Sequence, residues 1–184
     1  MRIIGGSLRG KQIVPVKGLS ARPTTDFAKE GLFNILSNSY DFEEISFLDL
    51  FSGTGSISFE MASRGCTNIT AVEMNNLHSS FIKKSAADYK FEGFNVVRHN
   101  VFDFIEICRL SYDIIFADPP YDLDKLELLP DKILNGSILK EGGLFILEHS
   151  GSYSFDNHPN FLRCKKYGNV HFSFFELNRD NSLN

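Results

Sequence analysis

Two short apolar segments that end in residues unsuited to a strand constrain the fold of this chain most strongly. Residues 47–50 run into a glycine turn at residues 52–55, and residues 114–117 run into the corner Asp118-Pro119-Pro120-Tyr121. Glycine favours a sharp turn and proline cannot donate to a strand ladder, so both segments must end there. In an open α/β sheet, ligands bind just outside the carboxyl ends of the strands. We therefore expect both turns on one rim of one sheet.

From residue 46 onward, strand-like and helix-like segments alternate. The expected strands are residues 46–50, 69–73, 94–98, 112–117 and 144–148, and the expected helices are residues 56–64, 75–89, 102–109 and 126–135. Two further runs, 161–167 and 170–176, flank Gly168-Asn169 and predict a tight antiparallel hairpin. The pattern predicts an α/β fold with a mostly parallel seven-stranded sheet, a terminal antiparallel hairpin and helices on both faces. This Rossmann-like plan is typical of class I methyltransferases.

A helix is also expected before the first parallel strand. Thr25 or Asp26 can cap its first turn, and Glu30 can reach back to the cap. Gly31 lies inside this helix at a cost of about 1 kcal/mol relative to alanine, so another part of the chain is expected to pack closely there. The apolar stripe of the helix comprises Phe27, Leu32, Phe33, Ile35 and Leu36.

Three regions are expected along the chain. Residues 1–21 form a basic N-terminal hairpin or arm, with residues 11–14 as its strand. Residues 22–177 form the methyltransferase domain, and residues 178–184 form a frayed polar tail.

The glycine turn differs from two common nucleotide-binding loops. A dinucleotide fold needs a third glycine after Gly53 and Gly55, and a phosphate loop needs a lysine; neither is present. Asp49, before the turn, would repel a pyrophosphate but suits a ligand that carries an ammonium and a sulfonium. We expect this ligand to contact Asp49, Phe51, Gly53 and Gly55.

Residues after the next two strands extend the predicted cofactor site. Glu73 closes the second strand, where a carboxylate can accept both hydroxyls of a ribose. Asn100 and Val101 follow the third strand and are expected at the edge and face of an adenine, with Asp103 as the alternative to Asn100. The predicted cofactor is S-adenosyl-L-methionine.

The proline corner predicts the chemistry. An exocyclic amine on a nucleobase is a poor nucleophile because its lone pair is drawn into the ring. The Asp118 carboxylate and the Pro119 carbonyl can accept its hydrogens, and Pro119 and Pro120 hold both acceptors in place. Tyr121 offers a face for a base lifted out of its stack. We predict methyl transfer to such an amine, with Asp118, Pro119, Pro120 and Tyr121 as catalytic residues.

Charge is distributed unevenly along the chain. The net charge is −4, yet residues 1–29 hold one acid, Asp26, and six basic residues: Arg2, Arg9, Lys11, Lys17, Arg22 and Lys29. A basic segment on an acidic body is typical of polyanion docking, so the predicted RNA contacts are Arg2, Arg9, Lys11 and Lys29. We also expect residues 1–15 to be removable without loss of the fold. A merely solvated arm is the alternative.

Other classes of protein are disfavoured. No apolar run is long enough to span a membrane, and three scattered cysteines fit reduced thiols in the cytoplasm. The five histidines lack metal-ligand spacing, so no metal is predicted. Cytosine-C5 transfer would need a Pro-Cys pair, which the chain lacks. We expect a monomer.

Several segments resemble the bacterial 16S ribosomal RNA (guanine-N2)-methyltransferases: residues 1–11, 22–26, 32–36, 49–55, 63–65, 73, 118–121 and 166–168. The resemblance implies methylation of one guanine of 16S rRNA, in the small subunit or an assembly intermediate. It also implies that Arg22 and Thr24 lie against the cofactor or the target base. The family usually carries arginines after residue 26, where this chain has Phe27, Ala28 and Lys29, so that Lys29 keeps one charge.

Two other functions remain open. A DNA adenine-N6 methyltransferase also uses an Asp-Pro-Pro-Tyr corner, although 184 residues leave no room for a separate target-recognition domain. A non-catalytic RNA-binding assembly factor could retain the cofactor fold, although the intact corner at residues 118–121 argues against it.

Overall fold

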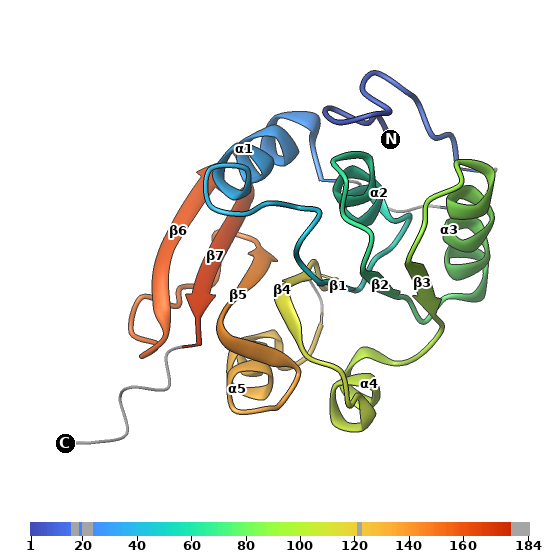
Figure 1. The fold of residues 1–184 in the computed structure, drawn as a ribbon. Coiled ribbons are helices and arrows are strands. Elements are labelled where there is room, and N and C mark those ends of the chain that lie inside the picture. The colour runs from blue at the N-terminus through green and yellow to red at the C-terminus, as the bar shows by residue number, and fades with distance from the viewer. Residues whose placement is uncertain (16–18, 20–23, 121–122, 178–184) are drawn as a thin grey trace.

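One seven-stranded sheet organises the molecule (Figure 1). The computed structural model describes residues 1–15, 19, 24–120 and 123–177. Its elements are α1 (Asp26–Leu36), β1 (Phe47–Leu50), α2 (Ser56–Ser63), β2 (Ile69–Val72), α3 (Asn76–Asp88), β3 (Phe94–Val97), α4 (Val101–Ile107), β4 (Tyr112–Ala117), the 3₁₀ helix η1 (Leu126–Leu128), α5 (Leu129–Leu134), β5 (Leu139–His149), β6 (Phe161–Tyr167) and β7 (Val170–Glu176). The strand order is β3-β2-β1-β4-β5-β7-β6. Strands β1 to β5 are parallel, and β7 pairs antiparallel with β5 and β6, so the predicted fold is confirmed.

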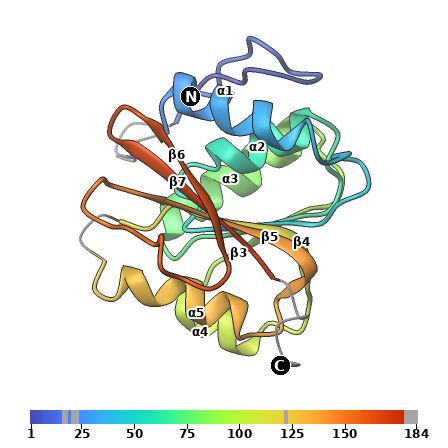
Figure 2. The same ribbon diagram turned by 90° about the vertical axis from the view of Figure 1, so that its left-hand side faces the viewer.

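Helices cover both faces of the sheet (Figure 2). α1, α2 and α3 lie on one face, and α4 and α5 lie on the other. Phe47, Phe116 and Phe174 are buried on the first face, whereas Leu48 and Ile115 are buried on the second. Neighbouring residues of one strand thus enter opposite cores, as a sheet covered on both faces requires.

Most elements match their expected bounds to within two residues, and two elements differ more. The helix expected at residues 126–135 is η1 followed by α5, because Pro130 lacks an N–H and is tolerated only in the first turn of an α-helix. β5 begins at Leu139 rather than residue 144, because Leu139 pairs with Tyr112 of β4 before a bulge shifts the register.

The start and the middle of α1 follow from single residues. Thr25 is the N-cap, and its Oγ1 accepts a hydrogen bond from the Ala28 N–H at 3.2 Å. The close packing expected at Gly31 is confirmed, since a Cβ there would lie 2.2 Å from the ring of Tyr167 in β6. The missing side chain therefore lets α1 approach the outer strand of the sheet.

The N-terminal residues form a hairpin that packs into the core. The Ile3 N–H donates to the Lys11 carbonyl at 2.9 Å, and the Ile13 N–H donates to the Met1 carbonyl at 2.9 Å. An isolated bridge between Arg2 and Gln12 stands where a strand over residues 11–14 was expected. Ile3 and Ile13 are buried in a cluster with residues of α2 and α3.

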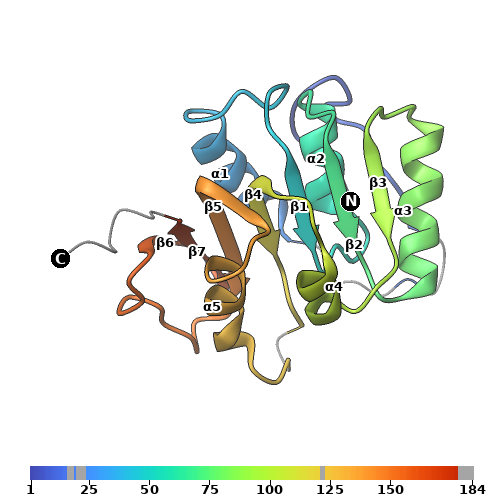
Figure 3. The same ribbon diagram turned by 60° about the horizontal axis from the view of Figure 1, so that its bottom comes forward.

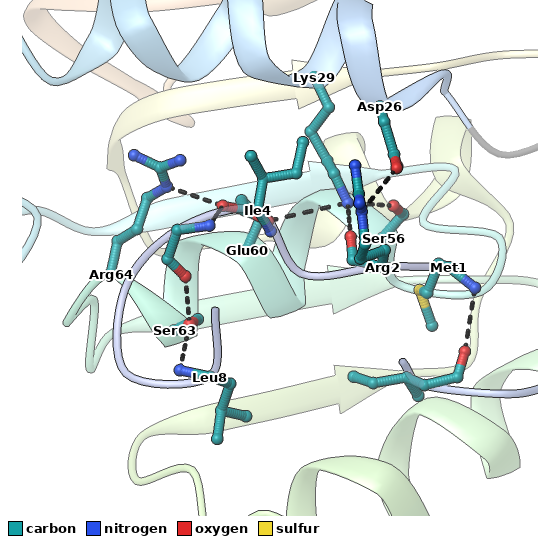
Figure 4. Close-up of polar contacts among 12 residues, drawn as sticks. Met1, Arg2, Ile4, Leu8, Asp26, Lys29, Ser56, Glu60, Ser63 and Arg64 are labelled. Atoms are coloured by element: carbon teal, nitrogen blue, oxygen red, sulfur yellow. Dashed lines mark hydrogen bonds and ion pairs between the residues drawn. The ribbon is translucent and has the colours of Figure 1, made fainter. Parts of the chain in front are cut away.

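A buried carboxylate fastens this hairpin to the helices (Figure 4). Glu60 of α2 is fully buried and accepts the backbone N–H groups of Ile4 at 2.8 Å and Gly5 at 2.7 Å. Arg64 donates to the same carboxylate at 2.9 Å, and Lys29 Nζ lies 3.7 Å from it. We therefore expect residues 1–15 to be needed for the fold, contrary to the expectation from the charge pattern.

The predicted RNA contact at Lys29 is wrong. Its side chain is 1% exposed, and its Nζ donates to the Arg2 carbonyl at 2.5 Å and to Ser56 Oγ at 3.3 Å. Burial lowers the pKa of this ammonium, which the Glu60 carboxylate opposes. The helical phase of α1 explains the placement, because Lys29 shares the inward face with Leu32 and Phe33.

Candidate active site

A cavity of about 490 Å³ opens at the carboxyl ends of the parallel strands. Ten residues expected in the site line it: Thr24, Asp49, Phe51, Gly53, Glu73, Asn100, Val101, Asp118, Pro119 and Pro120. Gly55, the N-cap of α2, is not among the lining residues, although its neighbours Thr54 and Ser56 are. Arg22 and Tyr121 lie outside the described residues. The glycine turn and the proline corner therefore share one rim and one cavity.

The turn after β1 has a backbone that few residues tolerate. Phe51, Gly53 and Gly55 all have positive φ angles, of 59°, 55° and 79°. A Cβ at Gly55 would lie 2.9 Å from the ring of Phe59, so glycine is required there by space as well as by φ. Phe51 in the left-handed region stores strain, a feature that clusters at functional sites. The turn brings backbone close to the cavity.

Glu73, at the end of β2, has a carboxylate that backbone hydrogen bonds fix in place. One oxygen accepts the Gly53 N–H at 2.8 Å, and the other accepts the Asn75 N–H at 2.7 Å. His78 Nδ1 lies 4.0 Å away. An ionised carboxylate has about four acceptor positions, so two backbone bonds orient Glu73 and leave capacity for ligand hydroxyls.

Asp49 is a buried carboxylate beneath the turn. It is 2% exposed and accepts a short hydrogen bond from Ser58 Oγ of α2. Burial raises the pKa of Asp49 to about 7, a net value to which the Ser58 hydrogen bonds contribute a lowering and the nearby charges of Glu73 and Glu148 contribute a smaller rise. A positively charged ligand in the cavity would stabilise the ionised form.

Asn100 is the N-cap of α4. Its Oδ1 accepts the N–H groups of Phe102 at 2.9 Å and Asp103 at 3.4 Å. The oxygen is thus occupied by the helix, whereas the side-chain amide nitrogen lies 4.0 Å from the Met74 sulfur and has a second hydrogen that can be donated to a ligand. Asp103, the alternative, is exposed and does not line the cavity.

The proline corner continues directly from the sheet. The Asp118 N–H donates to the Leu50 carbonyl at 3.4 Å, so the pairing of β4 with β1 extends to the corner. Asp118 is half-buried, Pro119 is buried and Pro120 is exposed. Asp118 therefore lines the cavity, and its backbone is fixed by the sheet pairing and by the two prolines that follow it.

A second carboxylate, Glu148, lines the cavity beside Asp118, and we call these two residues the acceptor wall. Glu148 was not predicted from the sequence as a site residue. Glu148, near the end of β5, is 3% exposed, lines the cavity and accepts a hydrogen bond from Thr24 Oγ1 at 2.8 Å. Leu147 pairs with Ala117, which puts Glu148 in line with Asp118 on the neighbouring strand. A charged residue that ends an otherwise apolar strand is the signal that would have found it.

The other predicted RNA contacts lie on the N-terminal hairpin. Arg2 forms an exposed ion pair with Asp26 at 2.9 Å. Arg9 is exposed beside Leu8, whose N–H donates to Ser63 Oγ at the C-terminal end of α2. The Lys11 ammonium lies 5.9 Å from the ring centre of Tyr89, which follows α3. Arg9 and Lys11 therefore sit beside helix ends that point away from the cavity.

Within the described part of the chain, no group of histidine, cysteine, aspartate or glutamate residues could hold a metal ion. Among the same residues, no helix is long and apolar enough to cross a membrane.

Comparisons with known proteins show the family of this chain. The family described as "Conserved hypothetical protein 95" matches residues 1–176. The chain belongs to this family. It is 33% identical over 150 residues to ribosomal RNA small subunit methyltransferase D of Escherichia coli K12, with 79% of this chain and 73% of that protein covered. It is 28% identical over 179 residues to the enzyme of the same name from Buchnera aphidicola, with 95% and 91% covered.

A solved structure has a similar fold. The Escherichia coli protein yhhF, described as a methyltransferase, superposes with a TM-score of 0.83 at 30% identity. The match covers 97% of this chain and 98% of that chain. The fold is that of the class I methyltransferases.

Proposed function

We propose that this protein transfers a methyl group from S-adenosyl-L-methionine to the exocyclic N2 amine of one guanine in 16S ribosomal RNA. Membership of a family whose named relatives are ribosomal RNA small subunit methyltransferases supports the enzyme class and the RNA. The observation that carries the finer claim is the pair of carboxylates, Asp118 and Glu148, on the acceptor wall.

The cavity suits S-adenosyl-L-methionine as the cofactor. Glu73 offers an oriented carboxylate for the ribose hydroxyls, and the Asn100 amide nitrogen can donate to the adenine. Asp49 and its acidic neighbours favour a cation, which matches the ammonium and the sulfonium. When bound, this cofactor supplies a methyl group on a positively charged sulfur.

The two acceptor carboxylates match the donor pattern of guanine. Guanine presents N1–H and N2–H₂ as adjacent donors, whereas adenine presents an acceptor at N1. Asp118 at the corner can accept an N2 hydrogen, and Glu148 on the next strand can accept N1–H. A carboxylate facing the adenine N1 lone pair would be repelled, so the acceptor wall favours guanine over adenine.

Asp118 acts by position rather than by strong basicity. Its carboxylate and the Pro119 carbonyl hold the amine hydrogens, so that the nitrogen lone pair is freed from conjugation with the ring. The sheet pairing and the two prolines keep these acceptors fixed, so little reorganisation is needed during the reaction. Asp118 then takes the proton, which becomes acidic once the new C–N bond forms.

Tritiated methyl transfer followed by nucleoside analysis tests this proposal. We expect N2-methylguanosine from unmethylated small subunits or 16S rRNA, no transfer to DNA, and loss of transfer in Asp118→Asn. N6-methyladenine in DNA would establish the alternative DNA-modifying activity. No transfer to any nucleic acid, with intact RNA binding, would establish a non-catalytic assembly factor.

A further inference from the structure

The outer strand of the sheet carries a concentration of positive charge. β6 has the sequence FLRCKKY, with three basic residues and no acidic one, although the whole chain has a net charge of −4. Arg163, Lys165 and Lys166 are all exposed. β6 pairs with β7 on one side and is the last strand of the sheet order, so its other edge is not covered by a further described strand. Such a strand attracts a polyanion.

Two aromatic rings continue this surface toward α1. Phe27, in the first turn of α1, is 69% exposed, and its ring meets the ring of Tyr167 edge to face at 5.5 Å between centroids. Tyr167 is the last residue of β6 and packs over Gly31. An exposed ring supported by a second ring offers a rigid platform on which a base can stack.

The surface leads into the cavity. Val170, at the other end of the β6–β7 turn, lines the cavity together with Thr25, the N-cap of α1. Tyr167 occupies the end of β6 nearest this turn, and Arg163 and Lys165 precede it on the same face of the strand, whereas Lys166 points to the opposite face. The basic residues Arg9 and Lys11 of the N-terminal hairpin lie beside helix ends directed away from the cavity. Of these two basic surfaces, the β6 surface adjoins the acceptor wall.

We propose that Phe27, Arg163, Lys165 and Tyr167 form a docking surface for the single-stranded RNA that flanks the target base. Arg163 and Lys165 neutralise backbone phosphates, and a neighbouring base stacks on Phe27. The flanking strand then crosses the turn beside Val170, and the target base enters the cavity. This inference rests on the proposed function for the identity of the RNA.

Charge reversal of the two basic residues on this face tests the electrostatic contribution. The variant Arg163→Glu with Lys165→Glu is compared with Lys83→Glu with Lys84→Glu, an exposed basic pair on α3. α3 lies at the opposite edge of the sheet (Figure 3), so the control changes net charge equally at a distant site. Affinity for unmethylated 16S rRNA is measured over a range of salt concentrations with saturating S-adenosylhomocysteine.

We expect the β6 variant to bind at least about tenfold more weakly than the control near 0.1 M salt. Its log–log salt slope should flatten by about 1.4, because each phosphate contact on a single strand contributes about 0.7. Phe27→Ala should weaken binding by about fivefold or more with an unchanged slope, since stacking is not electrostatic. S-adenosylhomocysteine affinity and thermal unfolding serve as controls for folding.

Equal affinities and equal slopes for the β6 variant and its control would overturn the docking surface. That result is distinguishable from failure of the proposed function. If the wild-type enzyme transfers no methyl group to 16S rRNA, the function fails, whereas a methylating wild type with an unaffected β6 variant rejects the surface alone.

Discussion

Replacing Asp49 by asparagine should stabilise the cofactor-free protein, and increasingly so as the pH rises. Burial raises the pKa of Asp49 from an ordinary value near 4 to about 7 in the folded state. Between these two values the folded protein holds a proton that the unfolded chain releases. Stability from this group is therefore fully present at low pH and is lost as the pH rises toward the folded pKa.

The magnitude follows from the two pKa values. The difference of about three units corresponds to about 4 kcal/mol at pH 8, where both states are ionised. Near pH 5 the folded carboxyl is still protonated, and the cost is about 2 kcal/mol. Asparagine keeps an oxygen to accept the bond from Ser58 but never ionises, so the variant escapes this cost.

Urea unfolding between about pH 5 and pH 8 provides the assay. We expect the stability advantage of Asp49→Asn over wild type to grow by about 2 kcal/mol across this range. Saturating S-adenosyl-L-methionine should reduce the advantage, because a cationic ligand stabilises the ionised carboxylate of the wild type. Parallel stability curves for the two proteins would refute the assignment of a pKa near 7.

Four further changes test the site and the fold. Asp118→Asn should slow single-turnover methylation by about 10²–10³-fold while calorimetry shows unchanged S-adenosylhomocysteine affinity; a rate within tenfold of wild type would contradict the acceptor role. Glu73→Gln should weaken S-adenosylhomocysteine by about 1–3 kcal/mol in the same titration, and unchanged affinity would reject the ribose contact. Gly31→Ala should lower the free energy of unfolding by about 1–3 kcal/mol through overlap with Tyr167, and adding Tyr167→Ala should remove the overlap. Deleting residues 1–13 should abolish cooperative thermal unfolding, because the buried Glu60 carboxylate loses two backbone donors; a sharp transition would show that the hairpin is separable.

Local patterns were sufficient to predict most of the fold. The strand–helix alternation, the glycine turn and the Gly168-Asn169 hairpin depend on residues that are neighbours in the sequence, so their structural meaning is readable without tertiary contacts. The common rim followed from one general property of parallel sheets, namely that their carboxyl ends lie together. The residues that line the cavity beside the turn and the corner were therefore largely predictable.

Tertiary structure decided the places of individual charged and aromatic side chains. Lys29 is buried and Phe27 is exposed, although the apolar pattern indicates the reverse, because the phase of α1 against the sheet and the N-terminal hairpin selects the inward face. Glu148 belongs to the acceptor wall only because β5 lies beside β4 and Thr24 reaches it from a distant part of the sequence. The sequence alone specifies which groups can do the chemistry, whereas contacts between distant segments decide which of them meet at the cavity.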